Sequence, residues 1–390
     1  MRGSLLAASV DAVRRLDRAV GQRSGQRSIL VDARTPVNYT MVAPMHRAMA
    51  ADPRVTFYFT ASEEPHRLQD IYCEAPEVRL ITPADARRRR FDAYIASDFM
   101  WQPLPRGTCR IQVFHGVGGK YGFDAPDTSM RVWDRIFFVN ERRLRNFVKA
   151  GAIDAGSPAI RLVGYPKVDA LVNGTWTRTA VLDSLGLDPA RPTLLYAPTS
   201  SPASSLNALG PALIERLLAT GANVIVKLHD RSRDLRTRYS GGVDWVAALE
   251  PVLRGRSAAL APGHDISPYL VAADLMITDH SSAGFEFLLR DRPIVRIHRP
   301  DLIREANIHP DYVALLASVS ASATSVDEVL RAVERGLAAP DALGETRRAV
   351  AADLFYRPGG ATARSIRNLY EAIELDPTPA LVTAEATCRP

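Results

Sequence analysis

The chain has 390 residues, of which 46% are apolar, so it is long enough for two domains that each bury a core. Its net charge of +6 suits an anionic partner, such as nucleic acid, a membrane surface or a phosphorylated substrate. No apolar run approaches the ~20 residues of a membrane-spanning helix, and three widely spaced cysteines argue against a disulfide framework and favour a reducing cytoplasm.

The first segment, residues 1–27, predicts an amphipathic helix followed by a linker. Apolar side chains recur at helical spacing over residues 4–20, with arginines between them. We favour a helix that packs on the body of the protein. The alternative is a basic anchor on the inner face of the cell membrane, because such a helix also suits an anionic lipid surface.

A parallel sheet is predicted from residue 28 onwards. Short apolar runs alternate with helical stretches, a pattern typical of strands that are covered on both faces. The four consecutive arginines at 87–90 lack interleaved aromatic residues and are interpreted as a solvated loop rather than a single-strand nucleic-acid site. The expected strands of this first domain, residues 28–172, are 28–32, 54–59, 77–81, 92–97, 110–114, 135–139 and 160–164.

The pattern restarts after a turn-rich gap, which predicts a second domain over residues 173–375. The fold class is therefore α/β, with two doubly wound domains whose strands end along one cleft, where ligands of such sheets bind. Residues 376–390 are expected to be a disordered tail. The expected strands of the second domain are 193–198, 223–229, 274–278 and 293–297, followed by C-terminal helices from residue 325.

Three loops at expected strand ends carry polar side chains or exposed backbone groups. In the last of them, Ser281 and Ser282 stand where a helix should begin, and a helix N-terminus attracts anions, so both can donate to phosphate oxygens. Glu286 lies one turn further on, where a carboxylate can accept from ribose hydroxyls. Capping of the helix by Asp279 or Ser281 is the alternative interpretation. The three loops are 115–122, 228–231 and 279–282.

Two histidines stand at the ends of expected strands in different domains. His115 precedes a glycine-rich loop that begins at Gly116, and His229 closes the strand over residues 223–229. Each histidine alone fits a functional and a structural role equally well, but one at the edge of each sheet indicates a shared cleft. Lys227 alternates with apolar neighbours, so it either joins this site or points to solvent.

No metal and no cofactor is expected. The sequence has no HExxH motif, no Cys/His cluster and no Asp-x-Asp pair at a strand end. A GxGxxG strand–helix fingerprint and a P-loop are also absent. A GxSxG elbow is absent too, and this argues against a serine hydrolase. No recognised nucleic-acid motif occurs, so nucleic acid is not expected as a partner.

Taken together, several stretches resemble the CDP-glycerol glycerophosphotransferase family, which primes and polymerises teichoic-acid-like polymers. The resemblance covers residues 92–300, and the combination is specific although each motif alone is weak. It implies a GT-B fold, in which two Rossmann-like domains face a cleft. The matching stretches, in the family's order, are FHGVGGKYG, DRIFFVNERRLRNFVKAGA, RLVGYPKVDAL, LLYAPTS, VIVKLH and ADLMITDHSSAGFEFLLRDRPIV.

The resemblance also implies roles for individual residues. His115 is expected to be the base that acts on the acceptor hydroxyl, and His229 is expected to contact the donor diphosphate. The two serines would hold phosphate, and Glu286 would lie near the ribose. The expected donor-binding residues are Gly116, Lys120, Thr199, Lys227, Ser281, Ser282 and Glu286.

The chain departs from the family pattern at three positions. His280 replaces the usual tyrosine, and Asp230 follows the second histidine where proline is common. Lys120 is the single remnant of a lysine pair. Because these positions lie in the expected site loops, the identities of the polyol and of the acceptor stay open.

The resulting hypothesis is a metal-independent transferase that moves glycerol phosphate or ribitol phosphate from a CDP-activated donor and releases CMP. Its expected partners are this CDP-polyol and a hydroxyl of a cell-surface glycan or lipid-linked acceptor. The nearest alternative is another GT-B enzyme, either a nucleotide-sugar glycosyltransferase or a UDP-N-acetylglucosamine 2-epimerase-like enzyme. A non-catalytic basic binding protein is a further alternative, motivated by the net charge.

Overall fold

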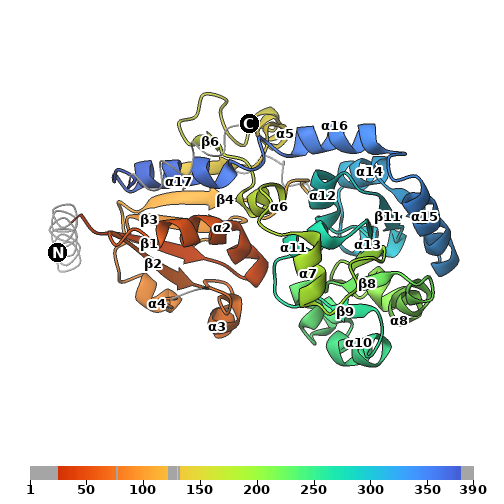
Figure 1. Cartoon of the computed structure of the whole chain (residues 1–390). Coiled ribbons are helices and arrows are strands. Elements are labelled where there is room, and N and C mark those ends of the chain that lie inside the picture. The colour runs from red at the N-terminus through yellow and green to blue at the C-terminus, as the bar shows by residue number, and fades with distance from the viewer. Residues whose placement is uncertain (1–24, 76–77, 122–129, 131, 379–390) are drawn as a thin grey trace, which may run out of the picture.

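The structure is a computed structural model that describes residues 25–75, 78–121, 130 and 132–378. Two α/β halves lie next to each other, and the chain passes from the first to the second between residues 162 and 193 (Figure 1). The predicted N-terminal helix lies outside the described residues, and so does most of the predicted disordered tail. The domain boundaries expected from the sequence stay a prediction.

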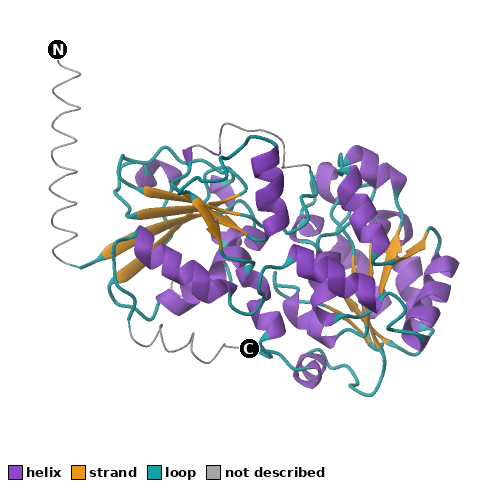
Figure 2. Cartoon of the chain, turned by 90° about the horizontal axis from the view of Figure 1, so that it is seen from above, coloured by secondary structure: helices purple, strands orange, loops and turns teal. Residues whose placement is uncertain are grey.

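The first sheet has six parallel strands in the order β2-β1-β3-β4-β5-β6. Its inner strands are buried because helices cover both faces, which Figure 2 shows from above, and the edge strand β6 is half-buried. The order reverses between β1 and β3. The strands are β1 (Arg27–Asp32), β2 (Val55–Thr60), β3 (Ala93–Ser97), β4 (Cys109–Val113), β5 (Arg135–Phe138) and β6 (Ile160–Leu162).

The second sheet also has six parallel strands, in the order β12-β11-β10-β7-β8-β9. Strands β7 and β10 are neighbours at its centre, with Leu195 opposite Met276. The order reverses between them, and this is the point where ligands bind in such sheets. The strands are β7 (Thr193–Ala197), β8 (Asn223–Val226), β9 (Ala258–Leu260), β10 (Leu275–Thr278), β11 (Ile294–Ile297) and β12 (Ala321–Ala323).

Half of the described α-helices begin at a side chain that accepts a backbone N–H, such as Thr35 for α2 and Asn140 for α5. The helices that precede β7 in the chain are α2 (Pro36–Met49), α3 (Leu68–Ile71), α4 (Pro83–Ala86), α5 (Glu141–Lys149), α6 (Asp169–Val172) and α7 (Arg178–Ser184), with the 3-10 helices η1 (Pro65–Arg67) and η3 (Pro166–Val168). Those that follow β7 are α8 (Ser205–Leu218), α9 (Thr237–Ser240), α10 (Trp245–Leu253), α11 (Ser267–Ala272), α12 (Ala283–Phe287), α13 (Pro300–Glu305), α14 (Pro310–Ser318), α15 (Val326–Ala338), α16 (Gly344–Leu354) and α17 (Ala361–Ala372), with η4 (Asp230–Arg233) and η5 (Leu288–Arg290).

One hydrophobic core runs from the first sheet into the inner face of the second, and a separate cluster fills the outer face of the second. Helix α17 returns to the first half, where it packs against α2 (Figure 1). Its end is fixed by Arg27, whose Nε donates to the carbonyl oxygen of Ile373 at 2.6 Å. The two halves are therefore joined by a shared core as well as by the linking chain.

One strand prediction is wrong, and two strands were missed. The segment expected as a strand over residues 77–81 forms only an isolated bridge between Leu80 and Phe59, and Leu80 is exposed, so no core face holds it in a sheet. Strands β9 and β12 were not predicted. Each has three residues and lies at a sheet edge, where short alanine-rich segments show no apolar periodicity.

Candidate functional site

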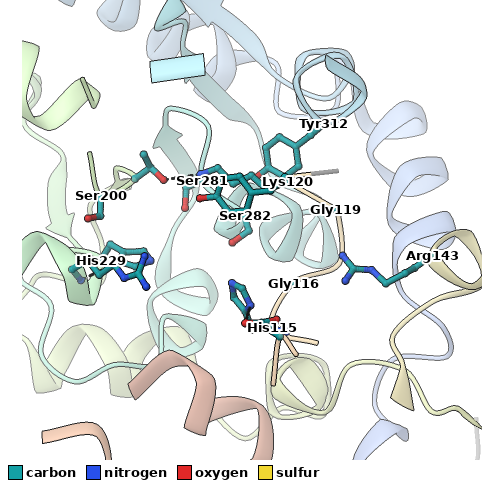
Figure 3. Close-up of a pocket in the computed structure, with 15 residues that line it drawn as sticks. His115, Gly116, Gly119, Lys120, Arg143, Ser200, His229, Ser281, Ser282 and Tyr312 are labelled. Carbon is teal, nitrogen blue, oxygen red and sulfur yellow. Dashed lines mark hydrogen bonds and ion pairs between the residues drawn. The ribbon is translucent and has the colours of Figure 1, made fainter. Parts of the chain in front are cut away.

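A pocket lies where the halves meet, beyond the carboxyl ends of strands from both sheets (Figure 3). A second cavity shares His115, His229, Ser281 and Ser282 with it, so the two cavities are adjacent. Four side chains from loops far apart in the sequence are thus brought together, as the strand-end argument predicted. The first pocket is lined from the first half by Asp98, His115, Gly116, Gly118, Gly119, Lys120, Tyr121 and Arg143, and from the second by Thr199, Ser200, His229, Arg231, Ser281, Ser282 and Tyr312.

His115 follows β4 and is held by an acid that follows the neighbouring strand β3. Its Nδ1 is in ion-pair contact with the Asp98 carboxylate, and its backbone N–H donates to the same group at 3.4 Å. Asn38 also donates to Asp98, at 3.0 Å. Because Nδ1 of His115 contacts the Asp98 carboxylate, Nε2 is the ring nitrogen that can contact a ligand. This pairing is the usual arrangement of a histidine base and its orienting acid.

Asp98 is buried and remains ionised. Burial raises its pKa, but the attraction of His115 and Arg34 outweighs this and leaves the pKa below the usual range for aspartate. Its backbone has a φ of 54° and that of Phe99 a φ of 66°, a left-handed conformation that costs about 1–3 kcal/mol for each non-glycine residue. Such strain clusters at functional sites, and here the strained residue carries the carboxylate that contacts His115.

His229 is positioned as a hydrogen-bond donor to the pocket. Its Nδ1 accepts the backbone N–H of Arg231 at 3.1 Å, so the ring proton of the neutral imidazole is on Nε2. Burial lowers the pKa of His229 to about 4, because the charged form is poorly solvated there. At neutral pH the residue is therefore a neutral ring with a fixed N–H, which suits a phosphate oxygen.

The serine loop is not a simple helix cap. Helix α12 has only five residues, and the side chain of its N-cap, Ser282, makes no capping hydrogen bond. Ser281 accepts the N–H of Ala283 at a long 3.4 Å. Asp279 accepts instead from the backbone N–H of Thr199 at 2.9 Å, which ties the loop after β10 to the loop after β7. Both serine hydroxyls line the pocket.

Lys120 reaches across the cleft from the glycine-rich loop. Its Nζ donates to Oγ1 of Thr199 at 3.0 Å, so two residues predicted for donor binding contact each other. Burial lowers the pKa of Lys120 to about 8, and the nearby Asp279 partly offsets this. An anionic ligand at this point would favour the charged ammonium.

The glycine loop brings the halves into close contact. A Cβ on Gly118 would lie 2.7 Å from the ring of Phe285 on α12, so only glycine fits there. Gly119 has a φ of 64°, which also favours glycine. Gly116 lines the pocket, but its position is open enough for a side chain.

Glu286 is engaged in a buried ion pair between the halves. Lys167, in η3, contacts its two carboxylate oxygens at 2.8 and 2.7 Å, and the side chains are only 5% and 8% exposed for Glu286 and Lys167. Glu286 lines the second cavity, as a ribose-binding residue would. Sequence analysis did not find Lys167 as its partner.

Lys227 does not point to solvent. It is 4% exposed, its Nζ donates to the carbonyl oxygen of Gly263 at 2.7 Å, and it lines the second cavity. Burial lowers its pKa to about 8. His280, which replaces the family's tyrosine, is buried and is not among the residues that line either cavity.

Sequence analysis missed Asp98, Lys167, Arg143 and Arg231. Asp98 had a usable signal, because it follows the buried strand β3 directly, next to the strand that ends at His115. Lys167 lies in the GYPK stretch quoted for the family resemblance but was assigned no role. Arg143 lies in a stretch quoted for the family resemblance and Arg231 ends the loop over residues 228–231, but neither was assigned a role.

Across the part of the chain that the structure describes, no group of His, Cys, Asp and Glu residues could hold a metal ion. The same residues contain no helix long and apolar enough to span a membrane.

A model of one protein family, CDP-glycerol:poly(glycerophosphate) glycerophosphotransferase, matches residues 48–373. No curated protein matches the sequence. Among solved structures, a variant of the wall teichoic acid polymerase TagF is 15% identical with a TM-score of 0.66, covering 90% of this chain and 89% of that one. A second TagF variant, soaked with CDPG, has a TM-score of 0.65 at 15% identity, covering 89% of each chain.

A UDP-N-acetylglucosamine 2-epimerase described as putative, from Listeria monocytogenes, is 14% identical with a TM-score of 0.56, covering 91% of this chain and 98% of that one. At these identities the structural matches show the fold alone. Together with the two parallel sheets, they confirm the GT-B arrangement of two Rossmann-like halves that face a cleft.

Proposed function

We propose that this chain, which belongs to the CDP-glycerol:poly(glycerophosphate) glycerophosphotransferase family and is thus an enzyme that transfers a polyol phosphate, uses CDP-glycerol as donor. Its acceptor is a hydroxyl of a cell-surface glycan or glycolipid, and CMP is the leaving group. The observation that carries this proposal is the placement of the Asp98–His115 pair opposite His229 and the two serines in one pocket.

The second half of the protein supplies groups that suit the donor diphosphate. Ser281 and Ser282 offer hydroxyls, and His229 offers a fixed N–H. Lys120 adds a positive charge from the opposite side of the cleft. Charge spreads over the phosphate oxygens when a phosphoryl group is transferred, so donors that are already in place lower the barrier. Each of these assignments is a proposal that binding measurements can test.

The first half supplies the base. We assign to His115 Nε2 the removal of the proton from the acceptor hydroxyl, whose oxygen then attacks the β-phosphorus of the donor. The bond from this phosphorus to the bridging oxygen breaks, and CMP leaves with the bonding electrons. Asp98 stabilises the imidazolium that forms. A positioned base of this kind contributes ~10²–10⁴-fold to the rate.

Glu286 and Thr199 complete the proposed donor site. The Glu286 carboxylate faces the second cavity, where it can accept from a ribose hydroxyl while it remains bound to Lys167. Thr199 orients Lys120 through its hydroxyl. Gly116 and Lys227 line the two cavities and contribute shape and charge.

Three finer points belong to the same proposal. Ribitol phosphate is the other polyol phosphate that the site is proposed to accept, because the pocket groups recognise phosphate rather than the polyol. A cytoplasmic location fits a nucleotide-activated donor. The apolar stripe of residues 4–20, with arginines between its members, suits contact with an anionic membrane surface, where a lipid-linked acceptor would lie.

CMP release tests this function. The purified chain is incubated with CDP-glycerol, CDP-ribitol or UDP-N-acetylglucosamine, with and without lipid-linked acceptors. The proposal predicts acceptor-dependent CMP release from a CDP-polyol and no turnover of the sugar nucleotide. Turnover of the sugar nucleotide alone would instead assign the chain to the nucleotide-sugar enzymes that share its fold.

A further inference from the structure

Asp230 is a buried carboxylate that joins the two halves next to the donor histidine. It directly follows His229, is 7% exposed and lines the second cavity. Its Oδ2 accepts the backbone N–H of Val37 at 3.1 Å, and its Oδ1 contacts Nδ1 of His264 at 2.8 Å. Val37 belongs to the first half, and His264 lies in the second half between β9 and α11. One carboxylate thus holds a segment of each half.

His264 makes further contacts with the first half, so the carboxylate is held firmly. Its backbone N–H donates to Glu74 at 3.0 Å, and its Nε2 lies 3.5 Å from Sγ of Cys73. Burial raises the pKa of Asp230, but the hydrogen bond from His264 and the attraction of Lys227 outweigh this and leave the pKa below the usual range for aspartate. Asp230 is therefore ionised at neutral pH, and both of its oxygens are engaged.

The start of α2 connects Asp230 with the proposed base. Val37 is the second residue of this helix, so the carboxylate accepts one of the N–H groups that a helix leaves unpaired at its start. The next residue, Asn38, donates its side-chain amide to Asp98 at 3.0 Å, and Asp98 contacts His115. A short series of hydrogen bonds therefore crosses the cleft from the donor loop to the base.

Asp230 occupies a position whose backbone also suits proline. His229 has a φ of −67° and a ψ of 147°, the extended conformation that precedes proline, and Asp230 is the first residue of η4. Proline, which is common here in the family, would keep this backbone and remove both contacts. The carboxylate is therefore not required by the local fold, and it is what this chain adds.

We propose that Asp230 is a positioning residue that keeps the base His115 aligned with the donor loop. It fixes the start of α2, and Asn38 transmits this alignment to Asp98. This inference rests on the proposed function and adds to it a residue that acts through others. A displacement of about 1 Å at a reacting group can cost ~10²-fold in rate, so a contact away from the reacting atoms affects transfer. A negative charge beside the diphosphate does not favour donor binding, so the benefit of Asp230 lies in alignment.

The test compares two substitutions of Asp230 with a matched control. Asp230→Pro removes both contacts and keeps the local backbone, whereas the amide of Asp230→Asn can still accept from Val37 and contact His264. Asp234→Asn is the control, because Asp234 lies at the end of the same 3-10 helix but pairs with Arg236 of the second half at 2.9 Å. Single-turnover CMP release from CDP-glycerol, with octyl phosphoglycerol as a soluble acceptor, gives the rate, and calorimetry gives the affinity for CDP.

Asp230→Pro should slow CMP release by about 10- to 100-fold, while the affinity for CDP stays at the parental level or rises. Asp230→Asn and Asp234→Asn should release CMP at close to the parental rate. Asn38→Ala should also slow release, and the double variant with Asp230→Pro should lose less than the product of the single losses, because both act through the start of α2. Parental release by Asp230→Pro, or losses that multiply in the double variant, would overturn the inference. Thermal melting establishes that each variant is folded, and Asp230→Ala replaces the proline variant if that one is not.

A measurement that needs no turnover separates this inference from the proposed function. The chain has 8 histidines, so the ring nitrogens of His115 can be followed by NMR after ¹⁵N-histidine labelling, with His115→Ala to identify its signals. Asp230→Pro should shift these signals, and Asp234→Asn should not. If the parent chain releases no CMP while this shift is observed, the positioning role stands and the transfer chemistry fails. If the parent chain releases CMP and the His115 signals are unchanged in Asp230→Pro, the chemistry stands and the positioning role is rejected.

Discussion

Replacing Glu286 with glutamine tests whether the ion pair with Lys167 joins the two halves. The substitution keeps the shape of the side chain and removes its charge. Lys167 then retains a buried ammonium whose distances to the two carboxylate oxygens were 2.8 and 2.7 Å in the parent chain. Because both side chains are less than a tenth exposed, little water is available to compensate for the lost carboxylate charge.

Breaking a buried pair from one side typically costs about 3–5 kcal/mol. We expect a loss of this size in the free energy of unfolding of Glu286→Gln. The control is Glu371→Gln, because Glu371 pairs with Arg135 at 3.0 Å but is 58% exposed. An exposed pair contributes about 0–1 kcal/mol, so this variant should melt close to the parent chain.

Urea unfolding followed by circular dichroism gives both free energies, and calorimetry gives the affinity for CDP and for 2′-deoxy-CDP. The double variant Lys167→Met with Glu286→Gln should recover part of the stability, since no charge then remains unpaired. The reasoning is refuted if Glu286→Gln unfolds with the parent's midpoint. In that case, loss of discrimination between the two nucleotides would make Glu286 a ribose ligand alone.

His115→Ala should lower the rate of CMP release by ~10²–10⁴-fold while calorimetry finds unchanged CDP affinity, because a base acts in the transition state; near-parental release would place the base elsewhere. Ser281→Ala combined with Ser282→Ala should weaken CDP binding, since each hydrogen bond to a charged group is worth about 1.5–3 kcal/mol, with little change in melting temperature. Early melting with parental affinity would instead make these serines structural. CDP affinity should fall as pH rises through about 8, where Lys120 loses its proton. Lys120→Arg should bind CDP without this alkaline loss, and a loss that persists in this variant would exclude Lys120 as its source.

The pattern of strands and the loops that follow them were predictable because they depend on local chemistry. Runs such as TLLYA over 193–197 are apolar on both faces, which only a covered parallel strand satisfies, and the carboxyl ends of such strands meet at one edge. The placement of His115, His229, Ser281 and Ser282 around one pocket follows from this rule. The roles of these residues in transfer stay predictions until binding and turnover are measured.

What the sequence did not reveal depends on contacts between distant segments. Glu286 and Lys167 are separated by 119 positions, and no periodic pattern indicates that they form an ion pair. Lys227 alternates with apolar residues as a solvent-facing side chain would, but the loop at Gly263 covers it and the Gly263 carbonyl oxygen accepts its hydrogen bond. Asp98 had a strand-end signal, but its contact with His115 depends on β3 and β4 being neighbours, which the structure shows.

The most direct test of the central claim is transfer of labelled glycerol phosphate from CDP-glycerol to octyl phosphoglycerol. The purified parent chain and His115→Ala are compared under single-turnover conditions, and both the labelled acceptor and CMP are quantified. We predict that the parent chain forms labelled acceptor and CMP in equal amounts, and that the variant forms neither at a comparable rate. Labelled acceptor formed equally fast by the variant would contradict the account, and so would the absence of labelled acceptor with the parent chain while UDP-N-acetylglucosamine is turned over.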